Sequence, residues 1–329
     1  MAMIDLSLFN GLPFTAAMAR DAGITRNRLH KMVASGLLRV VLHGVYVGAA
    51  VRDSLDLRAR AAALVLPPHV VVADRGASWL HGIDILDLAE LDAIPALDAV
   101  STGGKGRSRR SGVRGGKRDL STAEVWVLPS GVRVTSPVRT ACDVACLFGR
   151  YRAIAALDEF RRKHGLSVAD LYAALPRFRG RRGVIQLREL IPLTVDCADS
   201  QPESWTRLMI HDHGLPMPHA QVDLIVPGWG AARVENAYPH LRIAIEYDGE
   251  ENHTSDEDRE HDLTRRAALA AAGWLVIVLR KSDFTPARRA VWLADLASAI
   301  AERTPVQPSR RHYSRGPDHP SYPRRRARA

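Results

Sequence analysis

The spacing of apolar residues predicts two short helices and a hairpin within the first fifty residues. The expected segments are a helix over Phe14–Asp21, a turn at Ala22-Gly23-Ile24, a helix over Arg26–Ala34, and strands over Leu38–Leu42 and Val45–Val47 joined by His43-Gly44. Thr25 is suited to cap the second helix, and Gly36 is suited to end it. This order is typical of a winged helix-turn-helix.

After the hairpin, segments with the apolar spacing of helices alternate with segments that have the spacing of strands. The expected helices cover Leu55–Leu66, a segment from Asp74 or Ser78 through His81, Val138–Phe148 and Tyr151–Lys163, and the expected strands cover Val70–Ala73, Val125–Leu128 and Val132–Val134. We therefore expect a mixed middle domain over residues 51–199.

Residues 200–300 show the clearest succession of elements. The expected order is a helix over Pro202–His213, strands over Gln221–Val226, Ala232–Tyr238 and Leu241–Asp248, a helix from Glu257 to Ala272, and a strand over Trp274–Leu279. The order α-β-β-β-α-β and the mixed pattern before it predict an α/β protein of the α+β multidomain type.

A chain of 329 residues exceeds one ordinary core. We expect domains over 1–50, 51–199 and 200–302, followed by a basic disordered tail over 303–329. No apolar run reaches the roughly 18–20 residues of a membrane span, and no signal-peptide pattern opens the sequence. We therefore expect a cytoplasmic protein without membrane contact; the sequence leaves its oligomeric state open.

The formal net charge of +10 is concentrated in two segments. Gly103–Arg118 holds seven Lys or Arg and no acid, and the tail from Arg303 also carries +7, so the rest of the chain is −4. Both are rich in Gly, Ser or Pro, which predicts flexible segments that neutralise phosphates without reading sequence. Solubilising linkers are the competing interpretation. The candidates for DNA contact in the first segment are Arg107, Arg109 and Arg110.

The second predicted helix carries candidates for reading DNA. Helical spacing exposes Arg26, Asn27, His30 and Lys31 and turns Leu29, Met32 and Val33 inward. Arginine can pair with guanine and asparagine with adenine, so this face suits a major-groove helix. An ordinary amphipathic surface is the alternative.

Three cysteines, Cys142, Cys146 and Cys197, cannot all be paired. Cys142 and Cys146 would share a helix face, but no second pair at ligand spacing accompanies them. Buried free thiols are favoured over a metal site.

Carboxylates on a predicted interior strand require a partner, because burying an unpaired charge is costly. Alternation within Ile243–Asp248 places Glu246 and Asp248 on one face, and Glu235 joins them if the preceding strand pairs with this one. Three carboxylates repel one another unless a divalent cation lies between them, and oxygen ligands suit Mg²⁺ (or Mn²⁺). The predicted chemistry is metal-dependent phosphodiester hydrolysis; a salt-bridged sheet edge is the alternative.

Short motifs follow one another between residues 200 and 285. They are Pro202-Glu203-Ser204, Gly214-Leu215-Pro216-Met217-Pro218, Arg233–Pro239, Ile245-Glu246-Tyr247-Asp248-Gly249, His253, Asp262 and Gly273-Trp274. In this order they resemble the very-short-patch-repair-type endonucleases of the PD-(D/E)XK fold. The resemblance implies a restriction-endonuclease-like domain and a hydrolase dependent on magnesium.

The resemblance also implies site residues. The catalytic set is Glu203, Glu235, Glu246, Asp248 and His253, and the implied metal ligands are Glu235, Glu246 and Asp248. Glu235 stands where the family usually has Asp, and Asp248 stands where it has Lys. The charge of the missing lysine would come from Arg259 or Arg266. These departures also fit a catalytically inactive, DNA-binding fold.

The preceding region ends its predicted hairpin in Gly44-Val45-Tyr46 and contains Ser136-Pro137-Val138-Arg139-Thr140. In these features it resembles the AbiEi-type antitoxins. The first hypothesis is a DNA-binding protein with a Mg²⁺-dependent endonuclease-like domain. The competing hypothesis is a transcriptional regulator, an antitoxin-like autorepressor with an inactive nuclease fold and a toxin or other protein as partner. An RNA-directed nuclease is a third hypothesis.

Overall fold

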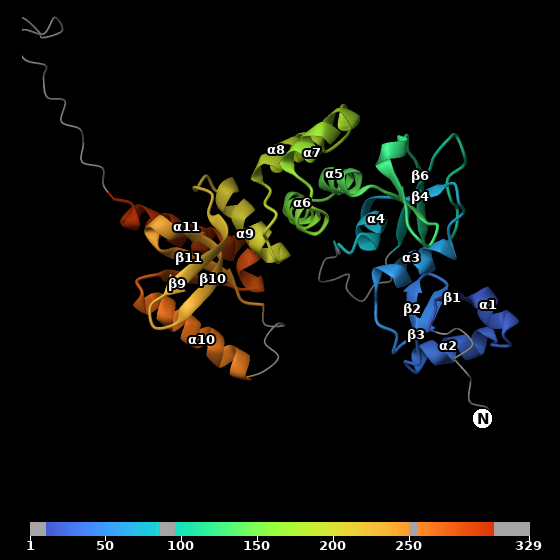
Figure 1. Cartoon of the computed structure of the whole chain (residues 1–329), viewed down its shortest axis with the longest axis horizontal. Coiled ribbons are helices and arrows are strands. Elements are labelled where there is room, and N and C mark those ends of the chain that lie inside the picture. Colours follow the sequence, from blue (N-terminus) through green and yellow to red (C-terminus); the bar gives the residue numbers. More distant parts are fainter. Residues whose placement is uncertain (1–10, 84, 86–95, 250–255, 306–329) are drawn as a thin grey trace, which may run out of the picture.

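The computed structural model describes residues 11–83, 85, 96–249 and 256–305. In this part of the chain, eleven α-helices accompany three separate β-sheets (Figure 1). The mixed α/β class expected from the sequence is therefore confirmed.

The N-terminal unit is a three-stranded sheet with two helices, in the strand order β1-β3-β2. Its elements are β1 Phe14–Thr15, α1 Ala16–Asp21, α2 Arg26–Ala34, β2 Leu38–Leu42 and β3 Val45–Gly48. The side chains of Thr15 and Thr25 cap α1 and α2. The first predicted helix is two residues too long, because Phe14 pairs with Tyr46 in the sheet.

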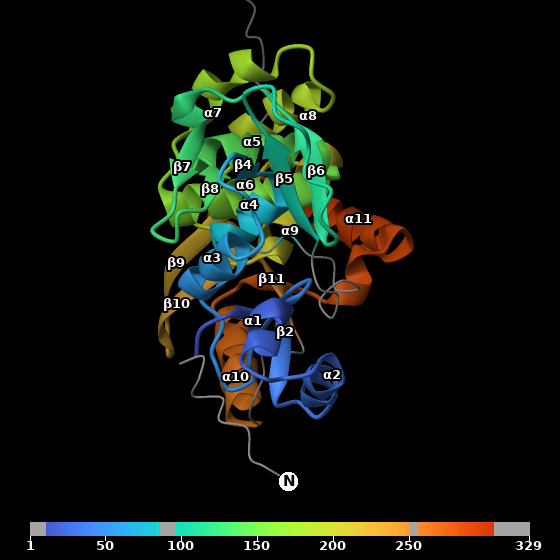
Figure 2. The ribbon, with the colours of Figure 1, turned by 90° about the vertical axis from the view of Figure 1, so that its right-hand side faces the viewer.

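The middle region contains a five-stranded sheet in the order β6-β5-β4-β8-β7. Its strands are β4 Val70–Val72, β5 Leu97–Ser101, β6 Val113–Lys117, β7 Val125–Val127 and β8 Arg133–Thr135. β4 and β5 are antiparallel, β5 and β6 parallel, β4 and β8 parallel, and β7 and β8 antiparallel. The sheet is therefore mixed, and in Figure 2 it lies directly above the N-terminal unit.

Helices pack beside this sheet. They are α3 Leu55–Ala63, α4 Asp74–Leu80, α5 Pro137–Leu147, α6 Arg150–His164, α7 Val168–Ala174 and α8 Val184–Leu190. Ala141 and Val144 of α5 and Leu157 and Phe160 of α6 are fully buried in one core cluster. The regular apolar spacing of α5 and α6 is what made them predictable, whereas the shorter α7 and α8 were not predicted.

The C-terminal unit has the expected succession of elements, followed by a long helix that was not predicted. The elements are α9 Gln201–Asp212, β9 His219–Val226, β10 Gly230–Tyr238, β11 Ile243–Tyr247, α10 Asp256–Ala271, β12 Leu275–Leu279 and α11 Pro286–Arg303. The strand order is β12-β11-β10-β9, with β11 and β12 parallel and the other neighbours antiparallel.

The two faces of β11 are covered by different helices. Ile243 and Ile245 are buried with Trp292 and Leu296 of α11, whereas Ala244 is buried with Leu269 of α10. The residues of β11 that share the parity of Ala244 therefore face α10. This alternation decides which helix Glu246 meets.

One expected boundary changes. Arg303 was assigned to the disordered tail, but it ends α11, and its Nη1 donates to the carbonyls of Leu241, Arg242 and Gly273. Residues 306–329 lie outside the described part. Among the described helices, none combines the length and the apolar character needed to cross a bilayer.

Candidate functional site

α2 presents a polar face to solvent. Leu29 and Met32 are buried against the small N-terminal core. The predicted contact residues are all exposed: Arg26, Asn27, His30 and Lys31. The structure therefore brings these four side chains together on one helix surface, as the spacing predicted.

The hairpin between β2 and β3 does not project freely into solvent. Its turn at His43-Gly44 lies against Gly112 of the middle region, where an added Cβ would overlap the His43 Cβ. A Cβ at Gly44 would lie 4.0 Å from Arg110 Nη2. The turn is thus packed against the basic segment, which places that segment beside the N-terminal unit.

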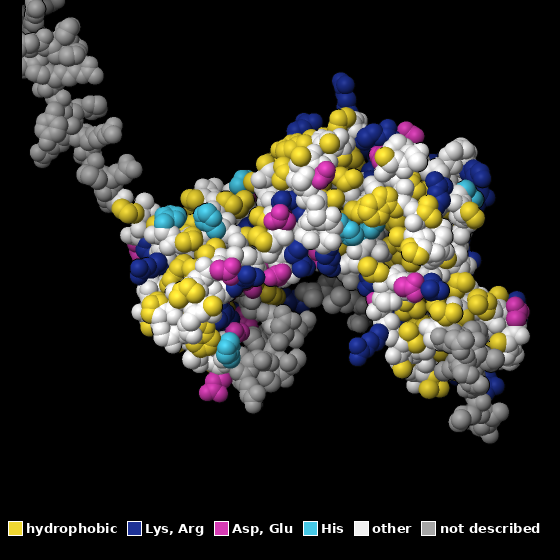
Figure 3. All heavy atoms as spheres, viewed as in Figure 1, with side chains coloured by type: hydrophobic (Ala, Val, Ile, Leu, Met, Phe, Trp, Pro, Cys, Tyr) yellow, Lys and Arg dark blue, Asp and Glu magenta, His cyan; other side chains and the backbone are white. Residues whose placement is uncertain are grey.

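The basic segment is more ordered than the sequence suggested. Its second half forms β6, paired in parallel with β5. Its exposed cations are Lys105, Arg107, Arg109, Arg110, Arg114 and Lys117, and Figure 3 shows Lys and Arg side chains at the outer edge of the middle region. The expectation of a flexible segment over 103–118 was therefore wrong for β6. This strand contains Gly115-Gly116, and two adjacent glycines are not typical of a strand.

Arg118 does not belong to this exposed set. It donates to Asp74 and, at 2.8 Å, to Asp143, which also receives a 2.7 Å hydrogen bond from Arg139 Nε. Arg139 is 1% exposed and also pairs with Glu124. This buried network holds α4, α5 and the end of β6 together. Its one sequence signal was the i, i+4 spacing of Arg139 and Asp143.

In the C-terminal unit, carboxylates from three elements meet near the sheet. Glu203 of α9 and Glu246 of β11 are buried, and Glu235 lies on β10. Asn236 of β10 pairs with Ile245 of β11 in an antiparallel register. The preceding residue of β10, Glu235, therefore lies beside the following residue of β11, Glu246. Its Oε2 accepts a 2.7 Å hydrogen bond from the backbone N–H of Tyr247. The predicted approach of Glu235 to Glu246 is therefore present.

The electrostatics of Glu235 reflect these neighbours. Burial raises the pKa of its carboxyl to about 8, and the negative charges of Glu203 and Glu246 act in the same direction. Glu203 itself accepts from the Asp199 N–H at 3.0 Å and from Gln221 Nε2 at 2.6 Å. Glu203 is thus held by two donors while Glu235 favours its neutral form.

Arginines of α10 bind the other carboxylates. Arg265 donates to both oxygens of Glu246 at 2.6 and 2.9 Å. Arg266 donates to Asp248 at 3.2 Å and approaches Glu246 at 3.4 Å. Arg266 was a predicted substitute for the missing lysine; Arg265 was not predicted, although it lies three residues after the motif residue Asp262.

These contacts test whether the predicted metal ligands suit a divalent cation. Two of the three, Glu246 and Asp248, hold guanidinium groups, and no group of three His, Cys, Asp or Glu side chains could hold a metal among the described residues. The expected Mg²⁺ (or Mn²⁺) ligand set of Glu235, Glu246 and Asp248 does not fit this arrangement. His253 lies outside the described residues.

The three cysteines are free thiols as expected, but only one of them is fully buried. Cys142 is buried and Cys146 half-buried, both as free thiols, while Cys197 is exposed. Burial raises the pKa of the Cys146 thiol to about 11, which disfavours the thiolate needed for metal binding.

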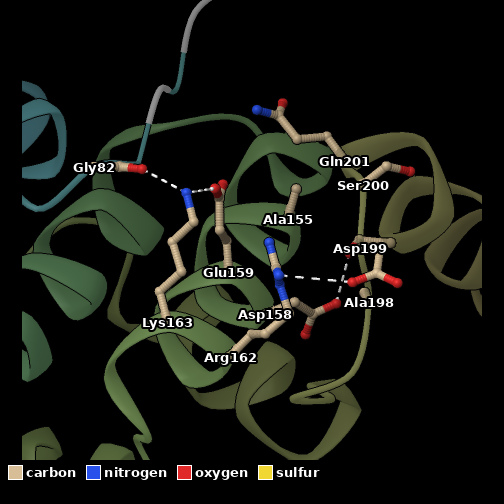
Figure 4. Close-up of a pocket in the computed structure, with 11 residues that line it drawn as sticks. Gly82, Ala155, Asp158, Glu159, Arg162, Lys163, Ala198, Asp199, Ser200 and Gln201 are labelled. Atoms are coloured by element: carbon tan, nitrogen blue, oxygen red, sulfur yellow. Dashed lines mark hydrogen bonds and ion pairs between the residues drawn. The ribbon is translucent and has the colours of Figure 1, made fainter. Parts of the chain in front are cut away.

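A cavity of about 180 Å³ lies where α6 meets the start of α9 (Figure 4). Its two cations are engaged: Lys163 Nζ lies 2.6 Å from both the Gly82 carbonyl and Glu159, and Arg162 lies 3.6 Å from Asp199. The cavity therefore lies in the packing interface between α6 and α9, and both of its cations already have partners.

Comparison with known proteins assigns the first two regions. Residues 1–47 match the family described as "Transcriptional regulator, AbiEi antitoxin", and residues 69–193 match "AbiEi antitoxin C-terminal domain". Both matches end before α9, so they give no support to the predicted nuclease domain.

Two relatives from Mycobacterium tuberculosis cover most of the chain. They are the uncharacterized proteins MT2308 of strain CDC 1551 and Rv2248 of strain H37Rv, each 33% identical over 263 residues, which is 79% of this chain and 92% of the relative. The chain therefore belongs to the same family as these two mycobacterial proteins and carries AbiEi antitoxin domains of the transcriptional-regulator type over residues 1–47 and 69–193.

Proposed function

We propose that this protein is a DNA-binding transcriptional regulator of the antitoxin type, in which the N-terminal unit acts as a winged helix-turn-helix. The observation that carries the proposal is the exposed face of α2, where Arg26 and Asn27 occupy the first turn of a helix in a domain matched to antitoxin regulators. Side chains at the start of a recognition helix reach base edges in the major groove.

The basic segment supports the same proposal from a second direction. The approach of His43 to Gly112 and of Gly44 to Arg110 brings this segment against the N-terminal unit, and its cations Arg107, Arg109 and Arg110 are exposed. Duplex DNA bound at α2 would present its phosphate backbone to neighbouring positive charge. The segment would then add affinity without reading sequence.

The test is binding to duplexes taken from upstream of the gene for this protein, measured by fluorescence anisotropy against random duplex. Arg26→Ala should weaken binding to the specific duplex by about tenfold or more. The matched control is Arg288→Ala on α11, a cation with 65% of its side chain exposed. Equal affinity of the wild-type protein for both duplexes would contradict sequence-specific regulation.

An antitoxin-type regulator also implies a protein partner. The name of the matched domains supports a toxin as that partner. Co-expression of this chain with the product of the adjacent gene, followed by size-exclusion chromatography of the tagged chain, tests the pairing. Separate elution of the two proteins would contradict a stable complex, leaving DNA binding unaffected.

DNA cleavage by the C-terminal unit is the second candidate function, and it would require a metal ion to displace Arg265 from Glu246. The order α-β-β-β-α-β and the approach of Glu203, Glu235 and Glu246 favour a restriction-endonuclease-like fold. Incubation with plasmid DNA and Mg²⁺ or Mn²⁺, with EDTA as control, tests activity. Nicking that Glu246→Ala abolishes, with DNA binding kept, would support it; absence of nicking by the wild-type protein would support an inactive fold.

A further inference from the structure

Glu246 is a buried carboxylate of the C-terminal unit with both of its oxygens paired. It is 4% exposed, and each of its oxygens accepts a hydrogen bond from a different nitrogen of Arg265. Such two-pronged pairing is the strongest form of carboxylate–arginine contact and fixes both groups in one plane. Arg265 is itself largely buried, with 16% of its side chain exposed.

The same lone pairs would be needed by a metal ion. A divalent cation at this place would have to bind the oxygens of Glu246 that Arg265 now occupies. It would also compete with Arg266 for Asp248. Together the two arginines bring two positive charges to the cluster, which is the charge of one Mg²⁺ or Mn²⁺.

The arginines also do the structural work expected of a bridging ion. Glu246 lies near the end of β11, an interior strand of the sheet, and Arg265 lies 19 residues later on the helix that covers this face. Their pairing therefore ties α10 to β11 beside the buried Ala244 and Leu269. Without it, the buried Glu246 would keep only the longer 3.4 Å contact with Arg266, and most of its charge would be uncompensated.

We infer that Arg265 is the built-in cation of the C-terminal carboxylate cluster, and that its guanidinium occupies Glu246 in place of a divalent metal ion. The wild-type domain is then a metal-independent fold whose acidic residues are neutralised from within. This inference concerns the C-terminal unit alone and does not depend on DNA binding by α2.

Titration of the full-length protein with Mn²⁺, measured by isothermal calorimetry, tests whether Glu246 binds a metal ion. Wild type and Glu246→Gln should give the same weak or undetectable heat. A Mn²⁺ site present in wild type and lost in Glu246→Gln would overturn the inference, because the metal would then have displaced Arg265.

Thermal unfolding of a double-mutant cycle tests whether Arg265 neutralises Glu246. Arg265→Met should lower the Tm by about 5 °C or more, because it leaves the buried Glu246 carboxylate with only the 3.4 Å contact to Arg266. Adding Glu246→Gln should recover at least half of that loss. The matched control is Arg233→Met, since Arg233 pairs with Asp223 while 59% of its side chain is exposed, and it should leave the Tm unchanged.

The cycle and the Mn²⁺ titration together decide whether Arg265 is the counter-charge of Glu246. Additive losses in the double variant would mean that Arg265 stabilises the unit through other contacts and would overturn its role as counter-charge. If Arg265→Met does not fold and the double variant does, the recovery is shown directly. If neither folds, the Mn²⁺ titration of wild type and Glu246→Gln still decides.

Discussion

Asp158 of α6 and Arg207 of α9 form an ion pair that is buried from solvent, with 2.7 Å between Oδ2 and Nη2 and side-chain exposures of 1% and 2%. Asp158 also accepts from the Ser204 hydroxyl at 2.7 Å and from the Val195 N–H at 2.8 Å. The pair joins the antitoxin-type middle region to the C-terminal unit. A second pair, Arg150 with Asp212, joins the start of α6 to the end of α9, with side chains that are 28% and 27% exposed.

The first prediction follows from this pair. Arg207→Met should destabilise the protein by about 3–5 kcal/mol, because Asp158 keeps a buried charge without its counter-ion. Adding Asp158→Asn should recover part of the loss. Urea unfolding of the single and double variants measures both effects.

The control for this prediction is the exposed pair of Arg60 with Asp56, whose side chains are 50% and 63% exposed. Arg60→Met should have little effect, because exposed pairs are screened by water. A loss as large for Arg60→Met as for Arg207→Met would contradict the importance of burial.

A second prediction separates base reading from backbone contact on α2. Asn27→Ala should reduce specific DNA binding by about 1–3 kcal/mol and leave non-specific binding unchanged, since its amide can pair with adenine. Lys31→Ala should weaken both, because an ammonium group contacts phosphates of any sequence. Competition titrations of a selected duplex against random duplex measure the ratio. The same ratio in both variants would show that α2 does not read bases.

A third prediction concerns salt. Replacing Arg107, Arg109 and Arg110 with Ser should flatten the salt dependence of DNA binding by about 0.9 for each phosphate that the protein no longer neutralises. Arg118→Ser should instead lower stability with no specific change in that slope, because Arg118 is bound to Asp74 and Asp143. An unchanged slope in the triple variant would show that the segment does not touch DNA.

A fourth prediction concerns acid stability. Burial is the main cause that lowers the pKa of His81 from 6.5 to about 4, and its Nε2–H donates to the Thr135 carbonyl at 2.8 Å. The unfolded chain therefore binds the proton more readily than the folded one between these values. The stability that His81 contributes is fully present above pH 6.5 and is lost as the pH falls through 4, amounting to about 3 kcal/mol.

The variant that checks this is His81→Gln, which keeps an amide donor but does not titrate. Unfolding midpoints between pH 7 and pH 4 should fall less steeply for His81→Gln than for wild type. His240→Gln, a change at an exposed site, should follow wild type. Parallel curves for wild type and His81→Gln would show that His81 is not kept neutral by the fold.

Local patterns were enough to predict several elements and one surface. Thr25, Leu29 and Met32 define where α2 begins and which side is buried, so the exposure of Arg26 and Asn27 followed from helical geometry alone. The alternation of β11 likewise predicted that Glu246 shares a face with Ala244. These features depend on neighbours within one or two turns of the chain, which the sequence displays directly.

Other features depend on which elements meet, and only the tertiary structure decided them. β6 contains two glycines and two cations and has no apolar alternation, so its pairing with β5 could not be read from it. Arg265 meets Glu246 because α10 crosses the face of β11, and Arg207 meets Asp158 because α9 packs along α6. Such partners are 19 and 49 residues apart. The sequence by itself determined the strongly periodic helices and strands and the face that the carboxylates share; which arginines reach those carboxylates was decided by helix packing, since charges compensate one another only at contact distance.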